Sequence, residues 1–256
     1  MAFLQWGQVW QGSTMRRVVI NRACDTERLQ AFRLANAHMP GIERIEGTEG
    51  RDIPLASLVE RGMADAGLVY KPGAIGAALS HLGLWSHAAH QNEALMIFED
   101  DALLCRNFEA ESARLIATLP PEWDVALLGY NFNAPITIDA LPGVTRSVIT
   151  FDERRMQKNA ASFGAQDFQS VAYRLLQAFG LCAYVVSPKG ARRLLEYCLP
   201  LRAQEYQQLG LDRMVRNVGI DVVTSYYFSR LEAYGAFPPL ALSPNDKTIS
   251  TISPRL

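Results

Sequence analysis

The chain has 256 residues, of which 49% are hydrophobic and 20% charged, a composition typical of a folded protein and not of a disordered one. Lys and Arg number 25 against 26 Asp and Glu, so the formal net charge is -1 and no global field favours nucleic acid or anionic lipid. We therefore expect a packed domain that does not bind nucleic acid.

The N-terminal segment differs in sequence pattern from the rest of the chain. We expect residues 1–14 to form an N-terminal extension and residues 15–256 to form a single domain. The extension contains Phe3, Trp6 and Trp10 but lacks the basic start and the continuous apolar run of a secretory signal. No stretch reaches the roughly 18 apolar residues of a membrane-spanning helix. We predict a cytoplasmic protein; the extension is either an ordinary terminal tail or a peripheral membrane contact, and the oligomeric state stays open.

Strand and helix patterns alternate along the first half of the chain. A β-branched run at 18–20 indicates a buried strand, and apolar residues repeat every three or four positions after Pro72, which suits the first turn of a helix. In chain order, we predict a strand over 18–20, a helix over 29–37, a strand over 42–45, a short helix over 55–66 and a long helix from 72 to 92.

The most informative junction follows that long helix. The apolar run Ala94–Phe98 stops abruptly at three consecutive carboxylates, Glu99, Asp100 and Asp101. This pattern is typical of a central strand of a sheet whose carboxyl end reaches the surface.

The second half of the chain is less regular. We predict a helix over 108–119, a strand over 125–129, a strand over 181–186, a helix over 188–197, a helix over 202–217 and a strand over 222–228, with extended coil from 237 onward. Residues 131–170 show no lasting periodicity, so we expect a flap or a partly ordered, flexible insertion there, suited to binding an acceptor.

This alternation favours an α/β fold with a mostly parallel central sheet flanked by helices, which binds ligands at the carboxyl ends of its strands. Neither a GxxxxGK[ST] loop nor a GxGxxG fingerprint is present, which argues against a P-loop NTPase and an NAD-dependent dehydrogenase.

The carboxylate triplet suggests a cation site. Adjacent carboxylates repel one another unless a cation or hydrogen bonds neutralise them, and hard oxygen ligands suit Mg²⁺ or Mn²⁺. In a strand, Glu99 and Asp101 point to the same side and Asp100 to the other, so the first and third residues form the natural pair. Taken alone, the triplet is equally well explained as a solvated acidic turn.

The start of the long helix also has unusual residues. Gly73 and Gly76 lie in its first turns, where small residues allow close approach of another backbone or a ligand. Ser80 and His81 follow one turn later. His81 could orient a carboxylate or contact a ligand, although a hydrogen-bonded structural histidine is the commoner outcome for such a position.

Several short motifs extend over nearly the whole chain. They are Ile20-Asn21 with Arg28, Gly50-Arg51, Pro72-Gly73-x-x-Gly76-x-x-x-Ser80-His81, Phe98-Glu99-Asp100-Asp101, Trp123-Asp124, Leu128-Gly129, Gly180–Tyr184, Ser187-x-x-Gly190-Ala191, Leu199-Pro200 and Asp212. In their order and spacing they resemble glycosyltransferase family 25, which includes bacterial lipooligosaccharide galactosyltransferases and collagen hydroxylysine galactosyltransferases.

The resemblance implies a GT-A-like, Rossmann-type fold that binds a nucleotide sugar, usually UDP-galactose or UDP-glucose, and inverts the anomeric carbon. It implies Mn²⁺ or Mg²⁺ as cofactor and a glycan or lipid-linked glycan as acceptor. Its implied site residues are Glu99 and Asp101 for the metal, Asp100 beside them in a catalytic role, Asn21, Arg28, Gly73, Gly76, Ser80, His81 and Glu99 for the donor, and Asp212 as catalytic base.

The mechanism expected on these grounds is direct displacement, with the metal neutralising the departing UDP and a carboxylate deprotonating the acceptor hydroxyl. Two other functions stay open. One is a nucleotide-sugar or carbohydrate-binding protein of the same fold without turnover. The other is a metal-dependent phosphohydrolase, which would also use clustered carboxylates.

Overall fold

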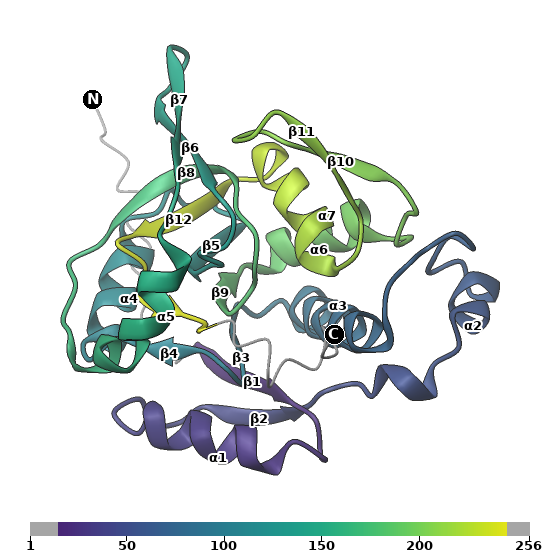
Figure 1. Ribbon diagram of the computed structural model, residues 1–256, viewed down its shortest axis with the longest axis horizontal. Helices are drawn as coiled ribbons and strands as arrows, with labels where there is room; N and C mark the ends of the chain where they lie inside the picture. The colour runs from purple at the N-terminus through teal and green to yellow at the C-terminus, as the bar shows by residue number, and fades with distance from the viewer. Residues whose placement is uncertain (1–14, 245–256) are drawn as a thin grey trace, which may run out of the picture.

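The computed structural model describes residues 15–244, and the predicted N-terminal extension with its possible membrane contact lies outside them. A large central sheet forms the middle of the molecule, with helices on both of its faces (Figure 1). Its strand order is β2 (Glu43–Glu46), β1 (Arg16–Asn21), β3 (Leu95–Glu99), β9 (Ala183–Val186), β5 (Val125–Gly129), β12 (Ala233–Phe237), β8 (Val171–Gln177), β6 (Ile136–Leu141) and β7 (Thr145–Ile149). Off this path, β13 (Ala241–Leu242) pairs with the end of β5, and β4 (Leu103–Leu104) pairs with β13.

Strand directions confirm the α/β class and refine it. β2, β1 and β3 pair in parallel, and β5 pairs in parallel with β12. β9 lies antiparallel between β3 and β5, so these two strands still point the same way. The carboxyl ends of β1, β3 and β5 therefore meet at one edge of the sheet, where such folds bind ligands.

Helices cover the two faces of the sheet unequally. The larger apolar cluster lies under α3 (Pro72–Gln91), α6 (Pro188–Cys198) and α7 (Ile220–Tyr227), whereas the smaller one lies under α1 (Thr26–Ala35) and α4 (Phe108–Ala117). The remaining helices are α2 (Leu55–Glu60), α5 (Glu153–Asn159) and the 3-10 turns η1 (Gly50–Asp52), η2 (Ala160–Ala165) and η3 (Phe228–Arg230).

Local sequence explains where two of these helices begin and end. α3 starts with Pro72, and it ends at Asn92, whose φ of 53° lies in the left-handed region that asparagine tolerates. α6 begins after Ser187, whose hydroxyl accepts a hydrogen bond from the Gly190 N–H at 2.9 Å. The start of each helix and the end of α3 match the sequence-based prediction.

The predictions for 131–170 and for the last third of the chain need correction. Residues 131–170 contain β6, β7, α5 and η2, and β8 follows them directly, so the first part of the segment extends the main sheet. The helix predicted over 202–217 is wrong, because this segment forms the hairpin of β10 (Glu205–Gln208) and β11 (Arg213–Arg216). The strand predicted over 222–228 is also wrong, since it is α7, and the predicted terminal coil contains β13.

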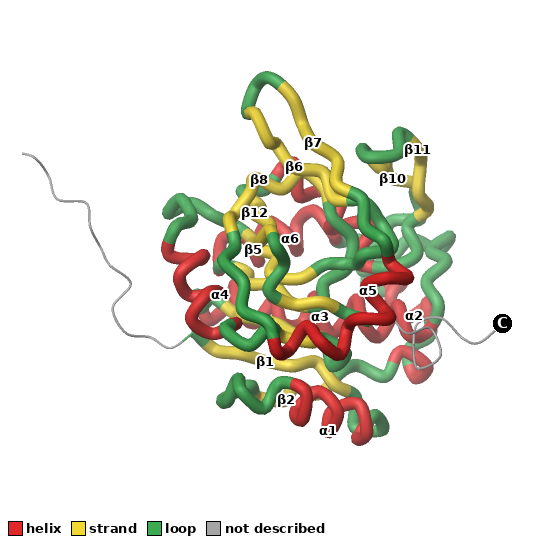
Figure 2. Tube along the Cα trace, turned by 60° about the vertical axis from the view of Figure 1, so that its left-hand side comes forward, coloured by secondary structure: helices red, strands yellow, loops and turns green. Residues whose placement is uncertain are grey.

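No helix among residues 15–244 is long and apolar enough to cross a membrane. Figure 2 shows the same elements after a rotation about the vertical axis, with the β6–β7 hairpin at the upper end of the molecule and α1 with β2 at the lower end.

Candidate active site

A cavity of about 490 Å³ opens at the carboxyl ends of β1 and β3. Its walls come from segments far apart in the sequence: the end of β1, α1, the first turns of α3, the carboxylate triplet, the loop before β9 and the start of α7. Of the predicted site residues, only Asp212 does not line the cavity. The residues that do are Asn21, Arg28, Gly73, Gly76, Ser80, His81, Glu99, Asp100 and Asp101.

The carboxylate triplet forms a turn, not a continuing strand. β3 ends at Glu99, and the Ala102 N–H donates to the Glu99 carbonyl at 3.1 Å, which closes a tight turn over Asp100 and Asp101. The prediction that Glu99 and Asp101 point to one side of a strand and Asp100 to the other therefore does not apply. They diverge because each has different partners.

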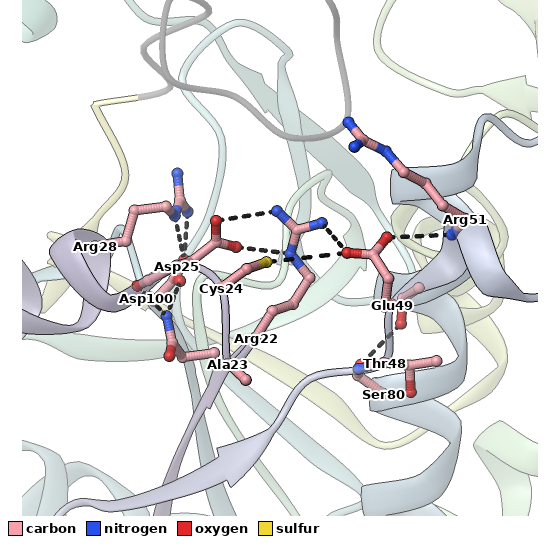
Figure 3. Close-up of polar contacts among 12 residues, drawn as sticks. Arg22, Ala23, Cys24, Asp25, Arg28, Thr48, Glu49, Arg51, Ser80 and Asp100 are labelled. Atoms are coloured by element: carbon pink, nitrogen blue, oxygen red, sulfur yellow. Dashed lines mark hydrogen bonds and ion pairs between the residues drawn. The ribbon is translucent and has the colours of Figure 1, made fainter.

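Asp100 faces α1 and β1 (Figure 3). The Asn21 side-chain amide donates to Asp100 Oδ2 at 2.7 Å, and the Arg28 guanidinium donates through Nε to Asp100 Oδ1 at 2.9 Å and through a second nitrogen to the same oxygen. The side-chain oxygen Oδ1 of Asn21 accepts from Arg44 Nε at 3.1 Å, which fixes the orientation of the side-chain amide. Asn21 and Arg28 thus hold Asp100 in place.

Arg22 is a charged cavity residue that sequence reasoning missed. Its guanidinium donates to both carboxylate oxygens of Asp25, at 2.6 and 3.0 Å, and to Glu49 Oε2 at 2.7 Å (Figure 3). It therefore joins the loop after β1 to the turn before η1. A bidentate arginine of this kind is a rigid fork, which suits it to shape a cavity wall.

Glu99 is oriented by a buried relay. The Tyr184 hydroxyl accepts a hydrogen bond from Trp85 Nε1 at 2.8 Å and lies 2.8 Å from His81 Nδ1. The tautomer that suits both partners has its proton on His81 Nε2, which donates to Glu99 Oε1 at 3.3 Å, while Nδ1 accepts from the Tyr184 hydroxyl. His81 is only 1% exposed, so it supports a carboxylate instead of facing solvent.

The two carboxylate oxygens of Asp101 differ in their partners among residues 15–244. Ser243 Oγ donates to Asp101 Oδ2 at 2.8 Å, while Asp101 Oδ1 is buried and has no hydrogen-bond partner within this range. Burial, followed by the nearby charge of Glu99, raises the pKa of Asp101 to about 6. A buried carboxylate oxygen is costly unless the group is paired, coordinates a cation or becomes protonated.

The charges of the described residues around the cavity do not balance. Among residues 15–244, five carboxylates line it, and the two lining arginines are already engaged, Arg28 with Asp100 and Arg22 with Asp25. Within residues 15–244, no ion pair joins Glu99, Asp101 or Asp221 to a lysine or arginine. This part of the cavity is therefore strongly acidic.

The two glycines of α3 allow close packing. A methyl group at Gly76 would lie 2.4 Å from the Thr48 carbonyl oxygen and 3.0 Å from the Gly50 nitrogen, so α3 touches backbone there. Ser80 Oγ accepts from the Thr48 N–H at 2.9 Å and donates to the Gly76 carbonyl. Gly76 and Ser80 thus position the loop that forms one cavity wall. Like Gly73, they also line the cavity.

Asp212 lies elsewhere. It sits in the turn of the β10–β11 hairpin with φ of 46°, it is exposed, and its Oδ1 accepts from Gln207 at 3.2 Å. It does not line the cavity. The helix predicted over 202–217, which would contain Asp212, is replaced here by a left-handed turn that begins a return strand.

Asp221 is the acidic residue that the sequence-based reasoning missed. It lies in the first turn of α7 and lines the cavity. Burial, then the charge of Glu99, raises its pKa despite opposing backbone N–H groups of Gly180 and α7. A methyl group at Gly219 would lie 2.7 Å from Asp221 Oδ1, so a glycine leaves room for this carboxylate. The pattern Gly219-x-Asp221 before an apolar helix was the available signal.

An α/β sheet with an acidic cavity at the carboxyl ends of its strands defines a Rossmann-like protein that binds its ligand at that edge. The model of glycosyltransferase family 25 (LPS biosynthesis protein) matches residues 59–209, more than half of the chain. The chain therefore belongs to this family and is a glycosyltransferase of lipopolysaccharide biosynthesis. No curated protein matches the sequence.

The matched segment contains Gly73, Gly76, Ser80, His81 and the carboxylate triplet. Asn21, Arg28 and Asp221 lie outside the matched segment, and the tertiary structure brings them to the same cavity. A glycosyltransferase uses an activated sugar donor and a glycan acceptor.

Proposed function

We propose that this protein is an inverting, divalent-cation-dependent hexosyltransferase, which moves galactose or glucose from a UDP-sugar to a hydroxyl of a glycan acceptor that is lipid-linked. Mn²⁺ is the favoured cation, with Mg²⁺ as the other hard ion that suits carboxylate ligands.

The observation that supports the cation most directly is Asp101 Oδ1, a buried oxygen in the cavity of Glu99 that has no hydrogen-bond partner in the described part of the chain. No group of three or more His, Cys, Asp or Glu side chains among residues 15–244 forms a complete metal cage. Two carboxylates with remaining positions filled by water and phosphate oxygens are what such an ion takes in phosphate-binding sites. Glu99 and Asp101 would hold it, and it would neutralise charge on the departing diphosphate.

The other residues have separate roles in this proposal. Asn21 and Arg28 fix Asp100, and the Tyr184–His81 relay fixes Glu99, so the carboxylates are positioned before substrate binds. Asp221 is the residue we propose as base, because it is a carboxylate inside the cavity with a raised pKa and can accept the proton of the acceptor hydroxyl. Asp212 lacks this access.

The roles can be separated by titration calorimetry with UDP in the presence and absence of Mn²⁺, combined with a transfer assay. Asp101→Asn should abolish the Mn²⁺-dependent part of UDP binding. Asp221→Asn should keep that binding and lower transfer by about 10²- to 10⁴-fold, the usual contribution of a general base. Asp212→Asn is the matched control, since asparagine tolerates the left-handed turn, and it should change neither quantity.

Two results would reject the assignment. Normal Mn²⁺-dependent binding by Asp101→Asn would exclude the metal site, and loss of transfer in Asp212→Asn with normal transfer in Asp221→Asn would return the base role to Asp212. Binding of UDP by the unmodified protein without any transfer or UDP release would favour the non-catalytic alternative. Proton NMR of the product's anomeric coupling tests inversion.

Folding controls are straightforward for Asp101. Its raised pKa means that the folded chain disfavours the ionised form, so above pH 6 the charge destabilises the fold. Asp101→Asn removes that charge and should be at least as stable as the unmodified protein in thermal unfolding at pH 7.5. A loss of UDP binding can then be assigned to the missing ligand oxygen.

A further inference from the structure

The segment 179–182, which leads into β9, contacts three residues that line the cavity. Its last carbonyl accepts from the Glu99 N–H at 2.9 Å, and its first carbonyl accepts from the Asn131 N–H at 2.8 Å. Between them, the backbone N–H of Gly180 stabilises the ionised form of Asp221. Glu99, Asp221 and Asn131 therefore surround one short segment of chain and border the same cavity.

The residues on either side of Asn131 hold it in place. Tyr130 is 1% exposed, and its hydroxyl donates to the Ala236 carbonyl at 3.1 Å. Phe132 packs against the Tyr130 ring and against Phe151, with 4.5 Å between the ring centroids of the second pair. Asn131 is thus fixed between two packed rings, directly beyond the carboxyl end of β5.

Gly180 leaves the space that the Asn131 amide occupies. A methyl group at Gly180 would lie 2.4 Å from Asn131 Oδ1, so any larger residue would displace the amide. The φ of Gly180 is 86°, a conformation in which other residues are strained. The amide therefore lies against the Gly180 backbone, at the border of the cavity.

Asn131 differs from most other uncharged polar residues of the cavity. The side chains of Asn21, Ser80 and Ser243 make hydrogen bonds within the protein. Within residues 15–244, the Asn131 amide makes none, and neither does the hydroxyl of Thr48 on the turn before η1 (Figure 3). An amide presents one acceptor oxygen and two N–H donors, which suits sugar hydroxyls because each of them both donates and accepts.

The position of Asn131 matches that of the donor hexose. In the proposed function, Glu99 and Asp101 hold the diphosphate, and Asp221 deprotonates an acceptor that attacks the opposite face of the anomeric carbon. The hexose then lies between these carboxylates, where the segment 179–182 brings Asn131. We propose that the Asn131 amide hydrogen-bonds hydroxyls of the donor hexose and so determines which sugar is accepted. This assignment rests on the proposed function.

Titration calorimetry in Mn²⁺ with UDP, UDP-galactose and UDP-glucose tests the assignment. Asn131→Ala keeps the backbone hydrogen bond to Phe179, and thermal unfolding checks that it folds. It should bind UDP as the unmodified protein does and the preferred UDP-hexose about 2- to 10-fold more weakly, the net contribution of one hydrogen bond. The preference between galactose and glucose should narrow. For the analogue of the preferred donor that lacks the contacted hydroxyl, both proteins should bind equally.

Asn131→Leu and Thr48→Val complete the test. Leucine has a similar size to asparagine but no hydrogen-bonding group, so Asn131→Leu separates a lost hydrogen bond from a collapsed wall and should also weaken hexose binding relative to UDP. Thr48→Val is the matched control, because it removes another cavity hydroxyl of nearly the same shape. It should leave the affinity ratio of UDP-hexose to UDP unchanged.

Three results would overturn the assignment. An unchanged affinity ratio in both Asn131 variants would exclude contact with the hexose, and an equal change in Thr48→Val would show that the effect is not specific. A raised KM for the acceptor with an unchanged donor ratio would place Asn131 at the acceptor instead. Failure of the unmodified protein to bind UDP at all would reject the proposed function itself, and this assignment with it.

Discussion

Gly76 and Gly83 lie two turns apart on α3, yet they have different surroundings. Gly76 packs against the backbone of the loop before η1, whereas nothing lies within 4 Å of a methyl group added at Gly83. Backbone cannot move aside as the end of a flexible side chain can. Gly76 is therefore needed for the close contact of α3 with the Thr48–Gly50 backbone. Gly83 makes no such contact, so alanine there would stabilise the helix.

Gly76→Ala should destabilise the fold by about 1–3 kcal/mol, as overpacked sites do, because the Thr48–Gly50 loop has to shift. The same shift would disturb the cavity wall and weaken donor binding. Urea unfolding and UDP titration measure the two effects. Gly83→Ala is the control and should raise stability by about 0.5–1 kcal/mol. Equal stability of Gly76→Ala and the unmodified protein would show that the close contact has no energetic role.

At the residue scale, the sequence located the acidic end of a buried strand and so Glu99, Asp100 and Asp101. It could not show that Asp100 is tied to Arg28 or that Ser243 binds Asp101, because these partners are 72 and 142 positions away. Asp221 was missed for the same reason, since its significance comes from burial beside the charge of Glu99.

At the scale of elements, long periodic segments such as α3 and uniformly buried strands such as β5 were predicted well because each has one clear pattern. α7 was taken for a strand because Val222, Val223 and Thr224 are β-branched. All three are buried, as is Ser225, and packing against α6 outweighs the intrinsic preference. The β10–β11 hairpin was missed because its turn depends on Asp212 with positive φ, a conformation for which glycine is the usual sequence signal and aspartate only an occasional one.

One contact between elements has a clear pH dependence. Glu111 on α4 accepts from the Ser170 N–H at 2.6 Å and pairs with Arg114, which holds α4 against the start of β8. The hydrogen bond from Arg114 holds the pKa of Glu111 below its usual value. A carboxylate with a lowered folded pKa stabilises the fold above its unfolded pKa and loses that effect as pH falls through the folded value.

Glu111→Gln should therefore cost about 1.5–3 kcal/mol at pH 7, the range for a hydrogen bond to a charged group. The difference from the unmodified protein should shrink steadily below pH ~4.5. Urea unfolding at pH 7, 5, 4 and 3.5 measures it. The control is Glu109→Gln on the same helix as Glu111. It removes an exposed ion pair with Arg17 and should have little effect at any pH. A pH-independent difference for Glu111→Gln would rule out the charge as its cause.

At the scale of the whole molecule, the site exists because the sheet order brings distant segments to one edge. β1 lies beside β3, so Asn21 meets Asp100, and β9 between β3 and β5 places the segment 180–181 in the same cavity. The alternation of elements predicted this edge, but not β9 running antiparallel within it. A short buried strand has the same pattern in either direction, so its orientation depends on long-range pairing.

A site assembled from so many segments should stabilise the whole fold when its ligand binds. With UDP and Mn²⁺ at about 100 times the dissociation constant, the gain is about 2.7 kcal/mol, which for a chain of this size raises the melting temperature by roughly 5–10 °C. Thermal unfolding against UDP-, GDP- and CMP-sugars, with Mn²⁺ or with EDTA, measures this gain. We expect the shift only for UDP compounds with the cation, unchanged in Asp221→Asn and absent in Asp101→Asn. Equal shifts for all nucleotides in EDTA would contradict a cation held by Asp101, because the buried carboxylate oxygen would then have no part in ligand binding.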